Sequence, residues 1–358
     1  MRKSVLLSIA ILFGVSQLRA EDRITIDYFT AVAAGETVDV NINLENTDHL
    51  YGGLQFDLYL PDGVTIVTTS SGALWCKPTD RLKYKDEFDD TQSMSTGVSQ
   101  KDDGCYSFLV YNIAEKEISG NSGAIFTIRL QASDAISTTG NVVKIKNQVL
   151  STVGAVQYTP ADKEDYPCTL QVPAKIAASG YGSFSWPRAL DFSGTGTTVF
   201  VGTQTSDGWL HLESVDNGKI PANTGVVLKG PASSTVYPQT IDETVTLSQT
   251  NLLKGTAEAA VAVTEAGYYA LSTKTAGTGF YLIDATKNVT IPQYKAYLQA
   301  NGGDGAREAF FFAEGTTGLT VSETEAAEDG AVYDLQGRRV DSPAKGIYVK
   351  DGRKIIVK

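Results

Sequence analysis

Apolar and polar residues alternate along most of this chain, which is the pattern of β-strands with one buried face. The clearest case is GLQFDLYL, whose apolar set is Leu54, Phe56, Leu58 and Leu60. The polar set between them is Gln55, Asp57 and Tyr59. The alternation predicts a strand with its apolar set in a core and its polar set on the outer face, ended by the turn residues Pro61-Asp62-Gly63.

The same alternation recurs in ETVDVNINL, AIFTIRLQA and NVVKIKNQVL, and no amphipathic helix of three turns is evident in this half. Short strands separated by turn signals are typical of an antiparallel sandwich. A second series of strand-like segments follows, including TTVFVGT, GWLHLESV, TGVVLKG and EAFFFAEG, with glycine-rich turns between them. The chain is therefore predicted to be all-β.

Shifts in composition divide the chain into segments. A jelly-roll-like β-sandwich is expected over residues 21–172, and a second all-β domain over 173–315, with the boundary in a proline-rich stretch. A polar linker, 316–330, precedes a short β-hairpin tail, 331–358.

Residues 1–20 have the features of a signal peptide. Arg2 and Lys3 form a basic start, Val5 to Val15 is an apolar run, and Ala20 offers a small residue for cleavage. The run is shorter than the ~20 apolar residues that a membrane-spanning helix needs. We therefore expect a protein without a transmembrane segment that is secreted, extracellular or held at the outer-membrane surface.

The charge distribution sets the tail apart from the rest of the chain. The whole chain has a net charge of −11, whereas residues 332–358 carry seven Lys or Arg and three Asp, a net charge of +4. Once the tail and the three basic residues of the first segment are set aside, residues 21–330 carry −18. A body this acidic argues against nucleic acid and anionic lipid as partners.

The charged stretch from Trp75 to Gly104 interrupts the alternation and is predicted to be a long surface excursion. Cys76 and Cys105 lie at its two ends, and a disulfide between them would close the loop at its base. In an oxidising compartment this pairing leaves Cys168 alone. Three free thiols are the alternative, because spacing alone does not show that the geometry of a disulfide is met.

Residues 24–172 resemble a cohesin-type domain, a jelly-roll sandwich of the carbohydrate-binding superfamily, through AGETVDVNINLEN, YGGLQFDLYLPDGV and GAIFTIRLQA. This resemblance implies a module that binds a protein partner, since the best-known members bind dockerins and assemble extracellular polysaccharide-degrading complexes. The Trp75 to Gly104 stretch departs from the family pattern.

Two further segments resemble known modules. Residues 173–315 resemble a domain recurrent in surface proteins of Gram-negative bacteria, through GYGSFSWPRALDF, IPANTGVVLKG and IPQYKAYLQA, with no biochemical role implied. The tail resembles the end of a type IX secretion sorting domain through YDLQGRRV and KGIYVKDGRKIIVK, with Gly337 and Gly352 as turn residues. That resemblance implies an address read by secretion machinery of the outer membrane.

Candidate binding residues come from two patterns. The partner-binding candidates are the outward set Gln55, Asp57 and Tyr59, because a polar face that bears an aromatic ring suits docking. A merely solvated face is the alternative. The candidates for stacking on carbohydrate are Trp75, Trp186 and Trp209. Burial in the core is the alternative for each tryptophan.

No pattern points to catalysis or to a cofactor. His49 and His211 are the only histidines, and no HExxH, GxSxG, Walker or GxGxxG signature occurs. The acidic clusters at Asp86–Asp90 and Asp102-Asp103 carry oxygen ligands that suit calcium, but the D-x-D/N-x-D/N-G loop is missing. We therefore predict no metal and no other cofactor, and no dockerin repeat in this chain.

Three functions remain, in this order. The first is an exported, non-catalytic binding or assembly module that grips a partner protein through the sandwich. The second is a carbohydrate-binding surface protein. The third and weakest is a polysaccharide-active enzyme with an unrecognised site.

Overall fold

The computed structural model describes residues 21–206, 208–300, 306–314, 332–333, 339–340, 346–350 and 353–357. The predicted signal peptide, the predicted linker and the turn glycines of the tail lie outside these residues. Strands dominate the described chain, and its helical pieces are two 3-10 turns, η1 (Asp80–Leu82) and η2 (Ala285–Lys287). The predicted all-β fold class is confirmed.

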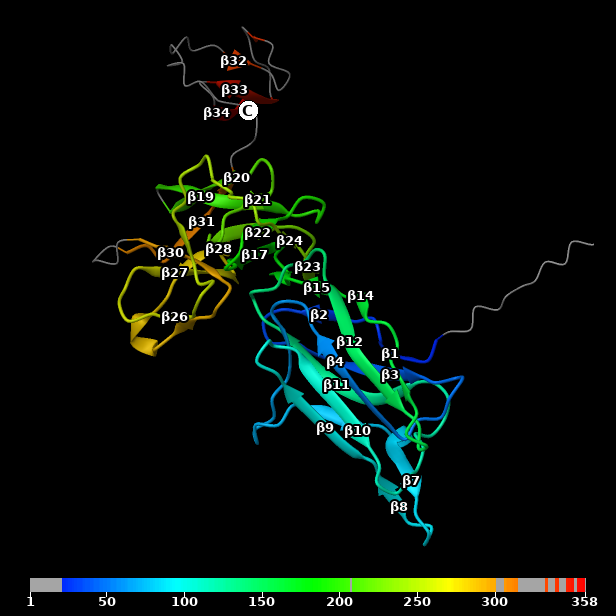
Figure 1. Cartoon of the computed structure of the whole chain (residues 1–358). Coiled ribbons are helices and arrows are strands. Elements are labelled where there is room, and N and C mark those ends of the chain that lie inside the picture. Colours follow the sequence, from blue (N-terminus) through cyan, green and yellow to red (C-terminus); the bar gives the residue numbers. More distant parts are fainter. Residues whose placement is uncertain are drawn as a thin grey trace, which may run out of the picture. The chain divides into compact units, whose positions relative to one another are not determined.

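Two antiparallel sheets form the N-terminal sandwich (Figure 1). The first sheet has the order β1-β3-β11-β5, and β6 also pairs with β11. Its strands are β1 (Arg23–Ile26), β3 (Thr37–Glu45), β11 (Ala124–Ala132), β5 (Val64–Ile66) and β6 (Cys76–Pro78). The second sheet has the order β13-β12-β4-β10-β9, and β14 also pairs with β12. Its strands are β13 (Gln157–Tyr158), β12 (Val142–Ser151), β4 (Gly53–Tyr59), β10 (Tyr106–Tyr111), β9 (Ser95–Gln100) and β14 (Lys163–Pro167).

The inner faces of the two sheets meet in an apolar core. Leu54, Phe56 and Leu58 of β4 are buried, as their alternation predicted. The Phe108 ring of β10 stacks on Phe56, with ring centroids 4.7 Å apart, and meets Phe126 of β11 at 5.4 Å. Because β4 and β10 belong to one sheet and β11 to the other, these three rings join the sheets. Each buried side chain of this size stabilises the fold by roughly 1.5–3 kcal/mol.

The prediction of a surface excursion from Trp75 to Gly104 is wrong. This stretch supplies β6 to the first sheet and β9 to the second, with a hairpin of β7 (Lys83–Lys85) and β8 (Thr91–Ser93) between them. Leu82 and Met94 are buried in the sandwich core. Polar composition misleads here because β9 is an edge strand whose side chains are mostly exposed.

The second strand series forms a nine-stranded sheet of the order β17-β22-β19-β20-β31-β28-β27-β30-β25 (Figure 1). Strands β20 and β31 pair in parallel, and the other neighbours are antiparallel. The strands are β17 (Tyr181–Phe184), β22 (Val226–Lys229), β19 (Thr198–Ser206), β20 (Trp209–Ser214), β31 (Ala309–Glu314), β28 (Gly277–Leu282), β27 (Tyr268–Lys274), β30 (Ala296–Gln299) and β25 (Leu253–Gly255).

Short strand pairs complete this part of the chain. They are β16 (Ala174–Ile176) with β23 (Ser234–Val236), β18 (Leu190–Asp191) with β21 (Lys219–Ile220) and β24 (Gln239–Thr240), and β26 (Val261–Ala262) with β29 (Thr290–Ile291). Earlier in the chain, β2 (Thr30–Val32) pairs in parallel with β15 (Thr169–Gln171). The last strand before the second series is therefore tied to the beginning of the sandwich.

The sandwich and the second strand series belong to one compact unit that ends at Glu314. Val172 and Ala174, on either side of Pro173, are buried in the same apolar cluster. The boundary expected at Pro173 is therefore bridged by a continuous core, and a domain division at that point stays a prediction.

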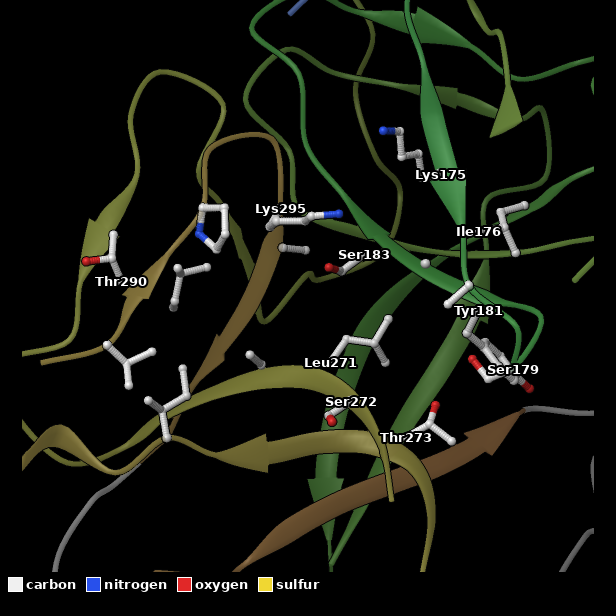
Figure 2. Close-up of a pocket in the computed structure, with 18 residues that line it drawn as sticks. Lys175, Ile176, Ser179, Tyr181, Ser183, Leu271, Ser272, Thr273, Thr290 and Lys295 are labelled. Atoms are coloured by element: carbon white, nitrogen blue, oxygen red, sulfur yellow. The ribbon is translucent and has the colours of Figure 1, made fainter. Parts of the chain in front are cut away.

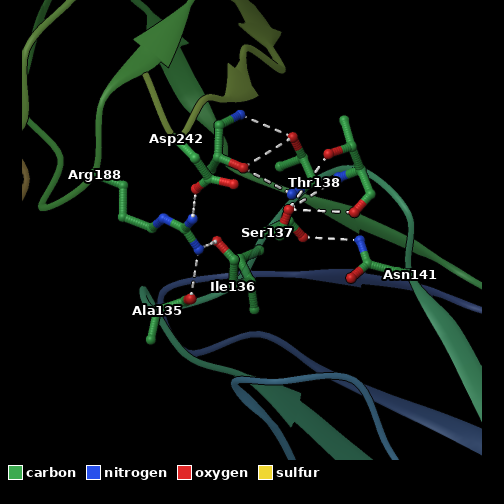
Figure 3. A network of polar contacts seen from close by, with 9 residues as sticks. Ala135, Ile136, Ser137, Thr138, Asn141, Arg188 and Asp242 are labelled. Atoms are coloured by element: carbon green, nitrogen blue, oxygen red, sulfur yellow. Dashed lines mark hydrogen bonds and ion pairs between the residues drawn. The ribbon is translucent and has the colours of Figure 1, made fainter. Parts of the chain in front are cut away.

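Polar contacts bridge the same boundary (Figure 3). The Arg188 guanidinium donates to the backbone carbonyls of Ala135 and Ile136, both at 2.9 Å, and pairs with the Asp242 carboxylate. Nearby, Thr138 and Thr240 exchange hydrogen bonds, each backbone N–H donating to the other residue's hydroxyl, at 2.9 and 2.8 Å. These contacts are well suited to holding the two strand series in one arrangement.

Beyond Glu314 the chain forms a second unit. Its described strands are β32 (Val332–Tyr333), β33 (Gly346–Lys350) and β34 (Arg353–Val357), in that order in one sheet. Strands β33 and β34 pair as an antiparallel hairpin, as the tail's sequence predicted. Within the described parts of the chain, no helix has the length and apolar character needed to cross a membrane.

Candidate protein-binding face

The outer face of the second sandwich sheet is the candidate site, and strand register fixes which residues meet on it. Leu109 of β10 lies between Gln55 of β4 and Gly97 of β9. Val149 of β12 continues the row on the far side of Gln55. Four strands thus place an exposed leucine beside a glycine and an amide on one surface.

Apolar side chains on this face are open to solvent. Leu109 is 43% exposed, Tyr111 is 48% exposed and Val153, after β12, is 41% exposed. All three line a hollow of about 300 Å³. We call Leu109, Tyr111 and Val153 the apolar patch. Ile113 and Val156, which are close in sequence to Tyr111 and Val153, are further exposed apolar residues.

Two glycines leave this patch uncovered. Gly97 lies opposite Leu109, and a Cβ added there would come within 3.9 Å of the Leu109 Cβ. A Cβ added at Gly53 of β4 would come within 3.0 Å of the Val110 carbonyl oxygen and 3.8 Å of the Tyr111 Cα. Glycine inside a strand often marks a place where another backbone or a ligand approaches closely.

The prediction that Asp57 projects into solvent as a contact residue is wrong, because its carboxylate is buried. The carboxylate accepts hydrogen bonds from Lys101 Nζ at 2.7 and 2.8 Å and from Asn147 Nδ2 at 2.8 Å. Asn147 has φ 52° and lies where the register between β12 and β4 shifts, so the irregularity turns its amide toward Asp57. Burial alone would raise the pKa of Asp57, but these hydrogen bonds and one involving Ser107 outweigh it and lower that pKa.

The other two predicted contact residues differ from Asp57 in exposure. Gln55 is exposed on the outer face, as predicted. Tyr59 is half-buried, and its hydroxyl donates to Asp103 Oδ2 at 3.2 Å. Hydrogen bonding with Cys105, together with partial desolvation, raises the pKa of Tyr59. Gln55 therefore borders the apolar patch as a free polar group, whereas Tyr59 is held by its neighbours.

The three tryptophans have three different environments. Trp186 is buried and packs against Phe184 and Tyr294, so the prediction that it stacks on carbohydrate is wrong. The Trp75 ring is covered by cations, with Arg129 Cζ 4.0 Å and Lys77 Nζ 4.7 Å from its centroid. Trp209 is 47% exposed, and only this ring among the three is open for stacking.

The predicted Cys76–Cys105 disulfide is absent, because all three cysteines are free thiols. Cys76 lies in β6 of the first sheet, whereas Cys105 precedes β10 of the second sheet and neighbours Asp103 and Tyr59. The two sulfurs thus belong to different layers of the sandwich. Burial raises the pKa of Cys76 to about 12 and that of Cys168 to about 11, which keeps both as unreactive thiols.

Asp86 of the first acidic cluster and His49 have structural partners. Asp86 accepts hydrogen bonds from the backbone N–H groups of Phe88 and Asp90, which closes the turn between β7 and β8. The Asp22 carboxylate accepts from the Tyr51 hydroxyl at 2.8 Å and lies 3.0 Å from His49 Nδ1. In the described part of the chain, no three His, Cys, Asp or Glu side chains are grouped to hold a metal ion.

Comparison with known proteins finds a family match for the N-terminal region. Residues 23–163 match the family model of the cohesin domain. The region therefore carries a cohesin domain, a class of non-catalytic protein-binding module. No curated protein matches the chain.

Several solved cohesins are similar to part of this chain. They include a non-cellulosomal cohesin from Archaeoglobus fulgidus (13% identity, TM-score 0.30, 43% of this chain and 91% of that chain). A cohesin of Acetivibrio cellulolyticus scaffoldin B, solved in complex with a mutant dockerin, has 10% identity and a TM-score of 0.29 over 42% of this chain and 96% of that chain. A type II cohesin from Bacteroides cellulosolvens has 15% identity and a TM-score of 0.29 over 41% and 98%.

Sequence reasoning missed the apolar patch. The signal was the run YSFLVY at Tyr106–Tyr111, which is apolar on both faces of its strand. In a two-layer sandwich, one face of a strand fills the core and the other meets solvent. A strand with apolar residues on both faces therefore indicates that its outer face is a surface for another molecule to cover.

Proposed function

We propose that this chain is an exported, non-catalytic assembly module of the bacterial cell surface. In this proposal its cohesin domain binds a dockerin-like protein through the outer face of the sheet β13-β12-β4-β10-β9. The match of residues 23–163 to the cohesin family supports a protein partner. The single observation that carries the choice of face is the solvent-exposed apolar patch on strands of this sheet.

The composition of the face suits a protein interface. Tyrosine and apolar residues are enriched at interface centres, and polar groups lie at the rim. Leu109 and Tyr111 serve as apolar anchors, and Gln55 supplies a polar neighbour in the same row. The Asp57 carboxylate is buried beneath the exposed Lys101 side chain, so in this proposal Asp57 holds the face in shape and does not touch the partner.

A comparative pull-down tests this function. The mature full chain, a Leu109→Ser/Tyr111→Ser variant and a Tyr237→Ser control are immobilised and exposed to the proteins secreted by the source organism. Tyr237 is a matched control because it is 44% exposed and lies in the second strand series. We expect a protein with duplicated D-x-D/N-x-D/N-G loops to be retained by the wild type and the control only. Equal retention by all three would contradict the proposed face.

Export is part of the same proposal. Residues 1–20 are proposed to be removed as a signal peptide, and the basic tail to address the chain to outer-membrane secretion machinery. Protein recovered outside the cell should begin near Glu21. Recovery of exported protein with Met1 intact would refute the signal peptide, and unchanged export of a chain lacking residues 331–358 would refute the role of the tail.

Carbohydrate binding is a second candidate function, favoured by one observation. The exposed Trp209 ring lies beside Phe311, with ring centroids 6.2 Å apart, on neighbouring strands β20 and β31. Stacking on sugar predicts glycan-array signals that Trp209→Ala abolishes. An enzyme with an unrecognised site is the weaker alternative, and it requires hydrolysis of a polysaccharide by the purified protein alone.

A further inference from the structure

A cavity of about 610 Å³ lies in the second strand series (Figure 2). It is open to solvent and is lined by β16, β17 and the turn between them on one side and by strands β27, β29 and β30 on the other. Its walls are largely aliphatic, with Ile176, Leu271, Ile283, Val289 and Ile291 among the lining residues. Cavities of roughly 300–1,000 Å³ with such walls are typical of small-molecule sites.

Two lysines give this apolar cavity a positive end. Lys175 of β16 and Lys295, directly before β30, both line it, in the upper part of the view in Figure 2. Within the described residues, no carboxylate pairs with either ammonium group and neither takes part in a hydrogen bond. The chain has 41 Asp and Glu against 30 Lys and Arg, so a pair of lysines without an acidic neighbour is not a consequence of composition.

The environment of Lys295 is unfavourable for its charge. Partial burial, together with the nearby Lys175 charge, lowers the pKa of Lys295. A desolvated ammonium without a partner destabilises the folded chain, and a bound anion would remove that penalty. The Ser183 hydroxyl lines the same cavity and offers an additional hydrogen-bond donor.

We infer that this cavity binds a small amphiphilic carboxylate. Its anionic head pairs with Lys295 and Lys175, and its apolar body lies against Leu271, Ile283 and Ile291. A singly charged head fits because only Lys295 is partly buried, whereas Lys175 is exposed and remains solvated. A head with two or more negative charges would lose more hydration free energy in the cavity than its attraction to one partly buried ammonium group restores.

Octanoate is the test probe, and isothermal titration with the mature full chain is the measurement. We expect saturable binding of one octanoate per chain, with affinity that rises from butanoate to octanoate as more apolar surface is buried. Octan-1-ol, which has the same chain without the charge, should bind at least about tenfold more weakly, in line with hydrogen bonds to charged groups.

Two variants separate the site from general charge effects. Lys295→Met keeps the side-chain bulk and removes the charge, so octanoate affinity should fall at least about tenfold. Its melting temperature should stay equal or rise, because the variant removes an unpaired, partly buried charge. Lys254→Met is the matched control, since Lys254 is exposed on β25 and its ammonium donates to Gln299 instead of lining the cavity.

Three results would overturn the inference. The first is the absence of saturable octanoate binding. The second is an octanoate affinity that Lys295→Met leaves unchanged in a folded protein. The third is equal affinity for butanoate and octanoate, which would show that anions meet surface lysines without using the cavity. None of these outcomes depends on the protein partner of the sandwich, so this inference and the proposed function fail separately.

Discussion

Asp57 holds the outer face of the second sheet together through two side chains, one from the connection between β9 and β10 and one from β12. Its carboxylate is almost completely buried and accepts hydrogen bonds from Lys101 and Asn147. Asp57→Ala should therefore lower the free energy of unfolding by about 2 kcal/mol, because a hydrogen bond to a charged group, such as the one from Asn147, contributes about 1.5–3 kcal/mol and the pair with the exposed Lys101 contributes little. Urea denaturation measures the loss. Tyr59→Phe is the control, with an expected change below about 0.5 kcal/mol.

The pH dependence of stability gives a second test of the same residue. The pKa of Asp57 is lower in the folded chain than in the unfolded one, where it is about 3.9. Its stabilisation is therefore complete above that unfolded value and is lost as the pH falls through the lower, folded value. The stability difference between wild type and Asp57→Asn should be constant from about pH 6 to 8 and shrink below about pH 4. A difference that persists undiminished at the lowest pH would contradict the ion-pair account.

Thiol counting tests the state of the cysteines. In the structure Cys76, Cys105 and Cys168 are all free, and burial raises the pKa of each. Native protein should react slowly with a thiol reagent near pH 8, and unfolded, unreduced protein should show three thiols. A count of one thiol after unfolding would restore the Cys76–Cys105 disulfide that the sequence suggested.

At the scale of elements, the stretch between Trp75 and Gly104 works as part of the sandwich. Leu82, which ends η1, is buried, and Arg81 beside it donates to the carbonyls of Leu44 and Gly123. Leu82→Ala should lower the free energy of unfolding by about 2–5 kcal/mol because it leaves a cavity in the core. Phe88→Ala, at a ring that is 77% exposed in the same stretch, should change it by less than about 0.5 kcal/mol. Equal, small effects would mean that the stretch is a solvated loop after all.

Alternation with a period of two was enough to place the core face of β4, because Leu54, Phe56 and Leu58 repeat on one side. It could not place Asp57, since the partner Lys101 lies 44 residues away and only the fold brings it near. It also could not show that β9 would leave Leu109 uncovered, because that depends on Gly97 being its neighbour across the strands. Periodicity thus predicts which face a side chain takes, whereas its neighbours follow from register.

The lysine pair of the cavity in the second strand series likewise could not be predicted from periodicity. Lys175 and Lys295 are far apart in sequence, and the segment IPQYKAYLQA, which contains Lys295, carries no sign that Lys175 lies near it. Trp186 likewise could be read as a core residue or as a sugar platform until its contacts with Phe184 and Tyr294 were known. Sites that are assembled from distant segments leave no local signal in one sequence.

At the scale of the whole molecule, the chain up to Glu314 should unfold as one cooperative unit. The apolar core continues across Pro173, and Arg188 ties the carbonyls of Ala135 and Ile136 to Asp242 (Figure 3). Calorimetry of the wild type should show a single transition for this unit, and Arg188→Ala should lower its midpoint, because the carbonyls of Ala135 and Ile136 lose their donor. Two well-separated transitions in the wild type would show that the two strand series are independent domains.

The central claim is that a protein partner docks on the apolar patch of the cohesin domain. Truncating an interface hot spot typically costs about 2 kcal/mol or more, roughly a thirtyfold loss of affinity. The two truncated residues are 43% and 48% exposed and lie outside the core, so the fold should tolerate their loss.

The most direct measurement is isothermal titration of the captured dockerin-like protein against wild type, Leu109→Ala/Tyr111→Ala and the Tyr237→Ala control. The account predicts at least that thirtyfold loss for the double variant, with an unchanged melting temperature and an unaffected control. Wild-type affinity in a well-folded double variant would contradict it.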